Sequence, residues 1–497
     1  MQKEISALEQ NETWVLTSLP VDKQAVDCKW VFKIKHNSDG SVERYKARLV
    51  AKGFTQVEGI DYHDTFAPVV KMTTVRCVLA IAASRKWPLY QLDVNNAFLH
   101  GLLDEDVYMR LPPGFYTQHR QNGLVCKLQR SIYGLKQASR QWFSRFSDAL
   151  VDFGFVQSMN DYSLFTLSIN GDFLILLVYV DDVVLTGTSS DLIMRVKQFI
   201  HEKFQIKDLG KLKYFLGLEV ARSTTGIFLN QRKYVIDLLD DYEFSECKPC
   251  KTPMEIKHGL GLSTAPLLPD ASVYRRLVGR LIYLTITRPD LAFPVHVLSQ
   301  FMQRPNEDHL RAAHRVLRYI KLAPAQGLFF SSNSNLQLTG YCDADWASCP
   351  ITRRSITGYC MLLGSSIVSW KTKKQVVVAR SSAESEYRSL AGACSEALWL
   401  VRLLSDMQVM VTIPIHVFCD SQAAIHIARN PVFHERTKHV EIDCHFVRHH
   451  VNTRFLLPSY INTTDQPADA FTKPLCFDRL NYLTSKLGVS NFLHFPT

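Results

Sequence analysis

The fold is decided by the stretch Phe-Leu-Ile-Leu-Leu-Val-Tyr-Val-Asp-Asp at residues 173–182. Its apolar run, 173–180, is typical of a buried β-strand, and a second apolar run, 183–185, follows the two aspartates directly. The pattern predicts a tight hairpin that carries two carboxylates at its tip. An Asp-Asp pair is also ordinary turn chemistry, but a solvent-facing turn does not require such hydrophobic arms.

The two aspartates at this tip, Asp181 and Asp182, predict a metal site. Adjacent carboxylates repel each other in a confined space, and a bound cation relieves that repulsion. Two-metal sites hold their divalent cations roughly 3.5 to 4 Å apart, mainly by carboxylates, so a third acid is expected. The candidate is Asp93, which ends the short stretch Tyr-Gln-Leu-Asp. Taken alone, an aspartate in that position is more often a helix cap.

Length and composition restrict the kind of protein. The 497 residues exceed one ordinary core, so two or more domains are expected. Hydrophobic residues make up 46% and charged residues 21%, which is typical of a globular protein. The formal net charge of +10 suits a polyanionic partner, although a solvated basic surface explains the same excess.

The twelve cysteines follow no repeating framework, and no signal peptide opens the chain, so we expect a reducing intracellular setting. The longest apolar run is too short to span a bilayer, and we expect no membrane role. Cys247 and Cys250 form the only close cysteine pair, with His309 and His314 far downstream. This spacing differs from that of zinc fingers and favours two unpaired thiols over a zinc site.

The chain divides into four predicted segments. Residues 14–255 mix strand-like runs with helical patterns, residues 256–335 are mostly helical, and residues 336–476 read as an α/β unit. Residues 477–497 carry scattered aromatics and are predicted to be a C-terminal tail.

Three motifs carry a resemblance to a known family: YQLDVNNAFLHG at 90–101, SIYGLKQ at 131–137 and YVDD at 179–182. They resemble the polymerase motifs of reverse transcriptases from copia-type long-terminal-repeat retrotransposons. The likeness extends in order along most of the chain, to KWVFK at 29–33, RYKARLVAKGF at 44–54, TFAPV at 65–69, YFLG at 214–217 and TRPD at 287–290. It implies a mixed α/β fold, with a right-hand polymerase of fingers, palm and thumb followed by a connection and an RNase H-like domain.

The resemblance implies roles in the polymerase segment by position in each motif. Asp93, Asp181 and Asp182 would be the metal ligands, and Phe98 would lie under the incoming sugar, where a ribonucleotide 2′ hydroxyl would clash. A core aromatic after a strand is the alternative for Phe98. The remaining nucleotide-binding candidates are Tyr133 and Gly134, as part of the floor beside the nucleotide, and Lys46 and Arg48 toward the phosphates.

The basic strand that holds Lys46, Arg48 and Lys52 has a second explanation. Its cations, interleaved with aromatics, are consistent with a grip on triphosphate and template phosphates. Basic edge strands also guard against aggregation. Which of the three residues touches triphosphate is therefore left open.

The C-terminal segment resembles the RNase H domain of the same family. The resemblance implies a second two-metal carboxylate site, with water as the nucleophile. Its four expected acids, which would be both catalytic and metal-binding, are Asp343, Glu386, Asp420 and Asp469.

Two of these acids have near neighbours that compete for the role. Ser381 and Glu384 have the spacing of a capping box, in which the glutamate folds back on the helix N-terminus, and this leaves Glu386 for the site. Asp343 and Asp345 lie on the same face of a strand, so alternation cannot separate them. The family pattern favours Asp343.

The other two acids also have simpler readings. Asp420 abuts a helix start, where capping is the alternative, and Asp469 lies in a loop, where a plain exposed acid is the alternative. His439 and His445 belong to a stretch that strongly resembles the family, and neither is assigned a role.

The resemblance implies an RNA-directed DNA polymerase with RNase H activity and two Mg²⁺ or Mn²⁺ ions per active site. Its expected partners are an RNA template, a DNA primer, dNTPs and the RNA–DNA hybrid, together with an element-encoded capsid or integrase. Location in cytoplasmic particles is expected, with the nucleus as the alternative. Because no zinc knuckle, protease motif or integrase zinc site is present, we expect a fragment of a longer polyprotein. A truncated relic that binds nucleic acid without catalysis is the competing hypothesis.

Overall fold

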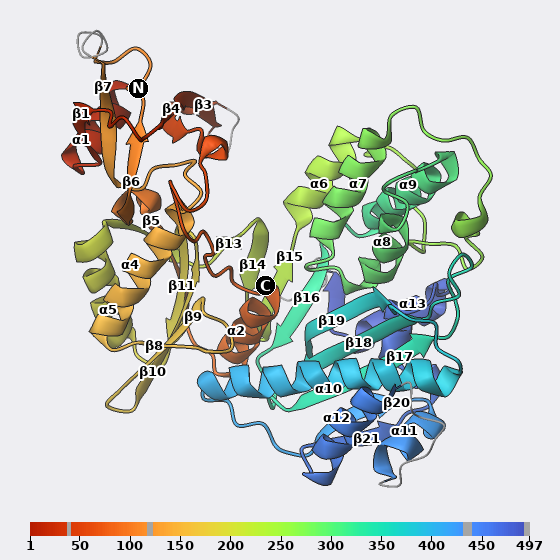
Figure 1. The fold of residues 1–497 in the computed structure, drawn as a ribbon. Helices are drawn as coiled ribbons and strands as arrows, with labels where there is room; N and C mark the ends of the chain where they lie inside the picture. Colours follow the sequence, from red (N-terminus) through yellow and green to blue (C-terminus); the bar gives the residue numbers. More distant parts are fainter. Residues whose placement is uncertain (37–40, 117–122, 431–439, 492–497) are drawn as a thin grey trace. The chain divides into compact units, whose positions relative to one another are not determined.

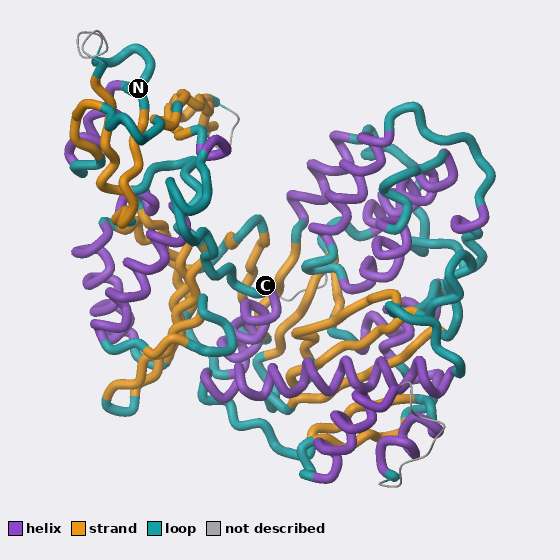
Figure 2. The backbone as a smooth tube through the Cα atoms, in the orientation of Figure 1, coloured by secondary structure: helices purple, strands orange, loops and turns teal. Residues whose placement is uncertain are grey.

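The computed structural model describes residues 1–36, 41–116, 123–430 and 440–491 (Figures 1 and 2). Helices and strands alternate along the chain, which confirms the predicted mixed α/β class. Within these residues, none of the helices combines the length and the apolar character that crossing a membrane would require.

The chain forms two compact units. The first contains residues 1–70 and 89–211, and the second contains residues 71–88 and 212–497. These units differ from the predicted segments, because residues 71–88 and 212–255 pack with the C-terminal part of the chain. The cause at residues 71–88 is helix α2 (Met72–Ser84), which is buried along most of its length and needs apolar surface around it.

A six-stranded antiparallel sheet forms the larger part of the first unit. Its strands, in spatial order, are β12 (Ile206–Lys211), β5 (Leu89–Val94), β11 (Asp182–Gly187), β10 (Asp172–Tyr179), β9 (Leu164–Ile169) and β8 (Val156–Gln157). Helices α4 (Ala138–Phe153) and α5 (Ser190–Phe204) belong to the same hydrophobic core. Both bury residues at a four-residue spacing, which places them on one helix face: Trp142, Phe146 and Leu150 in α4, and Leu192, Val196, Ile200 and Phe204 in α5.

The rest of the first unit is a smaller sheet and a long ribbon. The sheet has the order β1 (Trp14–Ser18), β7 (Leu124–Arg130), β6 (Leu102–Met109) and β2 (Ala25–Val26), and the ribbon pairs β3 (Cys28–His36) with β4 (Val42–Ala51). The short helices of this part are α1 (Gln2–Gln10), η1 (Gly53–Thr55) and η2 (Ala97–His100). The predicted basic strand is β4 for Lys46 and Arg48, whereas Lys52 lies just after the strand ends.

The second unit begins, in chain order after α2, with a five-stranded sheet and a group of helices. The sheet has the order β13 (Tyr214–Phe215), β14 (Leu218–Arg222), β15 (Gly226–Asn230), β16 (Gln326–Ser331) and β22 (Val489–Asn491). The helices are α6 (Arg232–Asp241), η3 (Leu260–Leu262), α7 (Ala271–Leu284), η4 (Pro289–Leu291), α8 (Ala292–Ser299) and α9 (Glu307–Leu322). Because β22 pairs with β16, residues 489–491 of the predicted tail are part of this sheet.

A buried ion pair stabilises the helical group. Arg288 and Asp290, from the Thr-Arg-Pro-Asp motif, lie 2.8 Å apart with almost no exposed side-chain surface. The Tyr319 hydroxyl also donates to Asp290, at 2.8 Å. Pro294, which interrupts a helical pattern in the sequence, lies in the first turn of α8, where its missing N–H has no helical partner to lose.

A second five-stranded sheet forms the C-terminal half of the second unit. Its order is β19 (Ser366–Lys374), β18 (Ile356–Leu363), β17 (Leu338–Asp345), β20 (Ile415–Cys419) and β21 (Leu456–Tyr460). The β17–β18 and β18–β19 pairs are antiparallel, whereas β20 is parallel to both β17 and β21. The accompanying helices are α10 (Ser382–Asp406), α11 (Gln422–Arg429), α12 (Glu441–Asn452), η6 (Thr463–Asp465), η7 (Pro467–Phe471) and α13 (Phe477–Lys486). Helix α10 packs along this sheet (Figure 1).

Candidate active sites

The hairpin predicted from the opening stretch is present. Strands β10 and β11 pair from Leu174–Gly187 to Tyr179–Asp182, so Val180 and Asp181 form a two-residue turn. Val180 has a positive φ of 54°, which is uncommon for a β-branched residue. The Val180 carbonyl accepts a hydrogen bond from the Trp142 indole at 2.6 Å. Trp142 of α4 therefore holds the tip in place, and no local sequence signal identified this role.

Strand β5 brings the third acid to the hairpin. Asp93 pairs directly with Asp182 across the β5–β11 ladder, and the Val94 N–H donates to the Asp181 carbonyl at 2.9 Å. All three acids are partly buried. The structure therefore places the three acids proposed for the polymerase site side by side, but they do not form one of the groups of three ligand atoms within 4.8 Å that the described residues contain.

The acids of this site perturb one another. Burial is the largest cause of a raised pKa at Asp93, and the neighbouring Asp181 raises it further, while Lys207, Lys46 and Arg48 act in the opposite direction. Burial likewise raises the pKa of Asp182, and Asp181 and Asp93 add to the effect. Gln91 opposes this shift by donating to Asp182 Oδ1 at 3.1 Å. Carboxyls in this state favour a proton or a cation.

The nucleotide-binding candidates lie close to one another in the first unit. The Phe98 and Tyr133 rings meet edge to face, with centroids 5.0 Å apart, and the Arg48 guanidinium lies 4.2 Å from the centre of the Tyr133 ring. The charge of Lys46 acts on Asp93. Phe98 also packs against two hydrophobic cores. It therefore has in part the packing expected of a core aromatic, which was the alternative for this residue.

Gly134 fits where no other residue would. Its φ is +93°, and a Cβ there would overlap the Ala51 carbonyl oxygen and lie 2.7 Å from Val50 Cγ1. The Ala51 N–H donates to the Tyr133 carbonyl at 2.8 Å. Gly134 thus allows the backbone beside Tyr133 to pack directly on β4.

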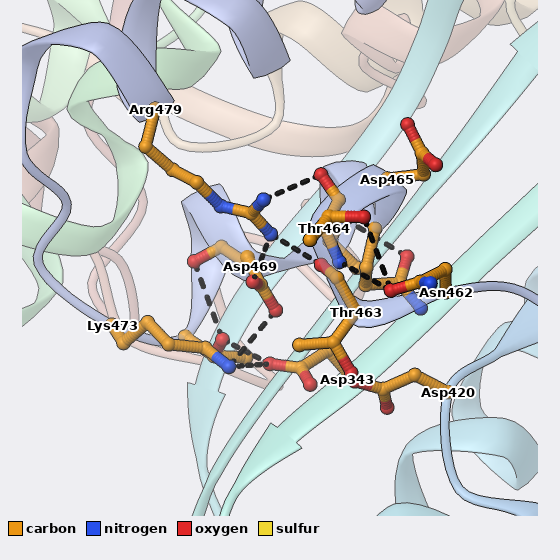
Figure 3. Close-up of polar contacts among 12 residues, drawn as sticks. Asp343, Asp420, Asn462, Thr463, Thr464, Asp465, Asp469, Lys473 and Arg479 are labelled. Carbon is orange, nitrogen blue, oxygen red and sulfur yellow. Dashed lines mark hydrogen bonds and ion pairs between the residues drawn. The ribbon is translucent and has the colours of Figure 1, made fainter.

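The second candidate site lies at one edge of the C-terminal sheet. Strands β17 and β20 are parallel, with Tyr341 opposite Phe418. Two residues further along, Asp343 and Asp420 reach the same edge. Asp469 joins them from η7, and one ligand oxygen from each of the three lies within 4.8 Å of the other two. Figure 3 shows this cluster.

Glu386 reaches this cluster from the first turns of α10. It is buried, and its Oε1 accepts from the Ala344 N–H at 3.2 Å. Glu386, Cys419 and Asp420 form a second group of ligand atoms within 4.8 Å of one another. Burial is the largest cause of the raised pKa at both Glu386 and Asp343, and neighbouring acids raise both further.

Glu384 bonds to residues around the start of helix α10. The Ser381 hydroxyl accepts from the Glu384 N–H at 3.2 Å, as a capping box requires. The Glu384 carboxylate accepts from the Arg380 N–H at 2.7 Å and pairs with Arg388 at 3.0 Å. The return bond therefore goes to Arg380, one residue before the predicted partner Ser381.

The structure also separates the other competing residues. Asp345 is in neither group of three ligands found among the described residues. Ser421 caps α11 by accepting from the Ala424 N–H at 3.3 Å, so capping does not explain Asp420. His445 lies on the exposed side of α12, 4.0 Å from Glu441, and His439 lies outside the described residues.

Asp469 is not a plain exposed acid. It lies in η7 and is 3% exposed. Arg479 of α13 donates to its Oδ2 at 2.8 Å, and Lys473 Nζ lies 2.9 Å from its Oδ1. The predicted tail therefore supplies a residue that positions Asp469. In the sequence, the only sign of this contact is that Arg479 follows Asp469 by ten positions, and this spacing does not predict that the two residues meet.

The C-terminal cluster fits a hard divalent cation. Asp343, Glu386, Asp420 and Asp469 supply oxygen ligands, which Mg²⁺ and Mn²⁺ prefer. Asp469 Oδ1 is buried, and the Lys473 ammonium lies within ion-pair distance of it. Cys247 and Cys250, in contrast, belong to no group of three or more ligands in the described part of the chain.

Comparison with known proteins agrees with this geometry. The family described as reverse transcriptase (RNA-dependent DNA polymerase) matches residues 11–256. A retrovirus-related Pol polyprotein from transposon RE1 of Arabidopsis thaliana is 45% identical over 491 residues, 99% of this chain and 33% of that protein. A putative transposon Ty5-1 protein of Saccharomyces cerevisiae is 36% identical over 299 residues, 60% of this chain and 97% of that protein.

The chain therefore belongs to the reverse transcriptase family. Its relatives are Pol polyproteins of copia-type retrotransposons, and it spans about a third of the length of those from Arabidopsis and tobacco. The foamy viral protease-reverse transcriptase, solved with dsDNA, matches 93% of this chain and 80% of its own at 12% identity and a TM-score of 0.26. That score is too low to support any inference about this chain.

Proposed function

We propose that the chain is an RNA-directed DNA polymerase that also degrades the RNA strand of the hybrid it makes. The observation that supports the proposal best is the presence of two separate acidic sites, one in each compact unit. Asp93 pairs with Asp182 at the hairpin tip of the first unit. Asp343, Asp420 and Asp469 converge in the second.

In the proposed polymerase site, Asp93, Asp181 and Asp182 would hold two Mg²⁺ or Mn²⁺ ions. Arg48 and Lys46 supply positive charge near these acids, which suits a triphosphate. Arg48 over the Tyr133 ring and Phe98 edge to face with Tyr133 would hold the sugar and base, and the Phe98 ring would exclude a 2′ hydroxyl. The template would be RNA and the primer DNA, with dNTPs as substrates.

In the proposed RNase H site, Asp343, Glu386, Asp420 and Asp469 would hold the same ions. Bound at either site, the metals would activate the attacking oxygen and stabilise the leaving one. The fold brings the four acids to one place. Asp343 and Asp420 lie near the ends of the parallel strands β17 and β20, Glu386 lies on α10, and Asp469 lies in η7. The hybrid would be recognised by its 2′ hydroxyls and shape.

Primer extension on an RNA template tests the polymerase. The full chain is expected to extend a DNA primer with dNTPs and Mg²⁺, and Asp181→Asn with Asp182→Asn to abolish extension. If the unsubstituted chain fails to extend while salt-sensitive hybrid binding is intact, the proposal fails and the relic hypothesis holds.

Cleavage of a labelled RNA–DNA hybrid tests the second activity. Glu386→Gln is expected to abolish cleavage. Glu384→Gln is its matched control, because the amide oxygen still accepts from the Arg380 N–H, and cleavage should continue. The assignment is wrong if Glu386→Gln cleaves normally or if Glu384→Gln alone abolishes cleavage.

A further inference from the structure

Lys473 lies inside the C-terminal acidic cluster. It follows Asp469 by four residues, and its Nζ lies 2.9 Å from Asp469 Oδ1 and 3.5 Å from Asp343 Oδ2. Both carboxylates are at most 4% exposed, whereas the Lys473 side chain is 32% exposed. Figure 3 shows the ammonium between the two acids.

The ammonium occupies space that a metal ion would share. Ligand oxygens of Asp343, Asp420 and Asp469 lie within 4.8 Å of one another, and Lys473 is in contact with two of these three acids. A divalent cation among the same oxygens would lie close to a like charge. Like charges held this close repel each other, so the ammonium and the metal compete.

The other partners of these acids do not bridge them, although Thr472 shares Asp343 Oδ2 with Lys473. Arg479 contacts Asp469 Oδ2, the oxygen that Lys473 does not approach most closely, and it is anchored on the Thr463 and Thr464 carbonyls. Thr472 donates to Asp343 without adding charge. Among the contacts described, Lys473 is therefore the cation that bridges the two acids.

We propose that Lys473 is a built-in counter-ion that holds Asp343 and Asp469 together before metal binds and must move aside when metal enters. The inference rests on the metal site of the proposed function. Lysine suits this role because its ammonium is a point charge on a flexible stem, and a partly exposed stem can swing into solvent. Arg479, which is fixed at three points, cannot do the same.

Metal binding without substrate tests the inference. The full chain would carry Asp93→Asn and Asp181→Asn to silence the polymerase acids, and free Mn²⁺ would be measured by electron paramagnetic resonance during titration. Lys473→Met in this background is expected to bind Mn²⁺ at least about tenfold more tightly than its parent. Its metal-free thermal midpoint is expected to be lower, because the acids lose their counter-ion.

Matched variants separate this role from simple structural support. Lys473→Arg keeps the charge and should bind Mn²⁺ within about threefold of the parent. Arg479→Met removes the other cation of Asp469 and should lower the midpoint without tightening Mn²⁺ binding. Lys473→Gln repeats the comparison if Lys473→Met does not fold.

Equal or weaker Mn²⁺ binding by both Lys473→Met and Lys473→Gln would overturn the inference and leave the metal site intact. A parent chain whose Mn²⁺ titration is unchanged by Asp343→Asn would overturn the metal site of the proposed function, and the inference with it. These two failures are distinct because the second is visible without any change at Lys473.

Discussion

At the scale of the residue, Gly134 in the proposed polymerase site has no room for a Cβ. Gly134→Ala combines a positive φ with overlap on the Ala51 carbonyl, so we expect a loss of about 2 kcal/mol or more in the free energy of unfolding. Displacement of Tyr133 should also raise KM for dNTPs. Urea unfolding and steady-state primer extension measure the two effects.

Gly59 provides the control for this prediction. It has a similar φ of +80°, but a Cβ there would meet nothing within 4 Å. Gly59→Ala should therefore cost only about 1 kcal/mol and leave KM unchanged. Equal effects of the two substitutions would mean that the close approach to β4 is not what makes Gly134 necessary.

The acidic residues of both sites could be proposed from the sequence, whereas the residues that hold them in place could not. The chemistry of metal binding and the family resemblance were enough to propose Asp93, Asp343 and the other acids. Trp142, Gln91 and Lys473 were not proposed, because each acts through a contact that only the fold creates: an indole on a turn carbonyl, an amide on Asp182, an ammonium between two acids.

At the scale of the element, His296 connects helix α8 to strand β19. Its Nε2 accepts from the Lys374 N–H at 3.2 Å. Burial, followed by the nearby Lys374 charge, lowers the pKa of His296 to about 4, against about 6.5 in an unfolded chain. The folded protein therefore keeps His296 neutral, while the unfolded chain takes up a proton below pH 6.5.

This difference predicts acid sensitivity of the second unit. The stabilisation by neutral His296 is complete above pH 6.5 and is lost as pH falls toward 4, by roughly 3 kcal/mol in total. In His296→Gln, whose amide oxygen can still accept the Lys374 N–H, the fall between pH 7 and 4 should be smaller by about that amount. Urea unfolding at several pH values measures it.

The exposed His426 on α11 serves as the control. His426→Gln makes the same chemical change at an exposed position, and the effect of His296→Gln is compared with it. If His296→Gln loses stability on acidification as steeply as the parent, burial of His296 is not the cause of the acid sensitivity.

At this scale, helices with a clear periodicity were predictable from the sequence, whereas the elements that pack or pair with one another were not. The four-residue spacing in α5 and the Ser381 cap of α10 were visible in the sequence and are present. The pairing of β22 with β16 joins residues far apart in the chain, and a strand of three residues carries no sequence signal of such pairing. The same limit concealed α13 as the support of Asp469.

At the scale of the whole molecule, the C-terminal residues 477–497 should be required for the second site. Their removal takes away Arg479 and the β22 edge strand. We expect hybrid cleavage to fall at least about tenfold, because Asp469 loses the Arg479 ion pair that positions it, while primer extension stays within a few-fold of the full chain. Both rates can be measured on one preparation.

Arg479→Met is the matched point variant for this truncation. If the account is right, it reproduces part of the cleavage loss with the sheet intact. Full cleavage by the truncated chain would contradict a positioning role for α13.

The division of the molecule into units was also beyond the sequence. The change from mixed to mostly helical patterns predicted a boundary near residue 255, whereas packing assigns residues 71–88 and 212–255 to the second unit. Helix α2 is apolar on nearly every side, and that composition predicts burial without saying where. The predicted segments are based on local patterns along the chain, whereas the compact units are based on packing between residues that can be far apart in the chain. The two divisions therefore need not coincide.

The central claim is that one chain carries two independent acidic metal sites with different chemistry. A single reaction tests it: a labelled DNA primer on a separately labelled RNA template, with Mg²⁺ and dNTPs. The unsubstituted chain should extend the primer and cleave the template, Asp181→Asn with Asp182→Asn should only cleave, and Glu386→Gln should only extend. Loss of both activities in either variant, or neither activity in the unsubstituted chain, would contradict the account.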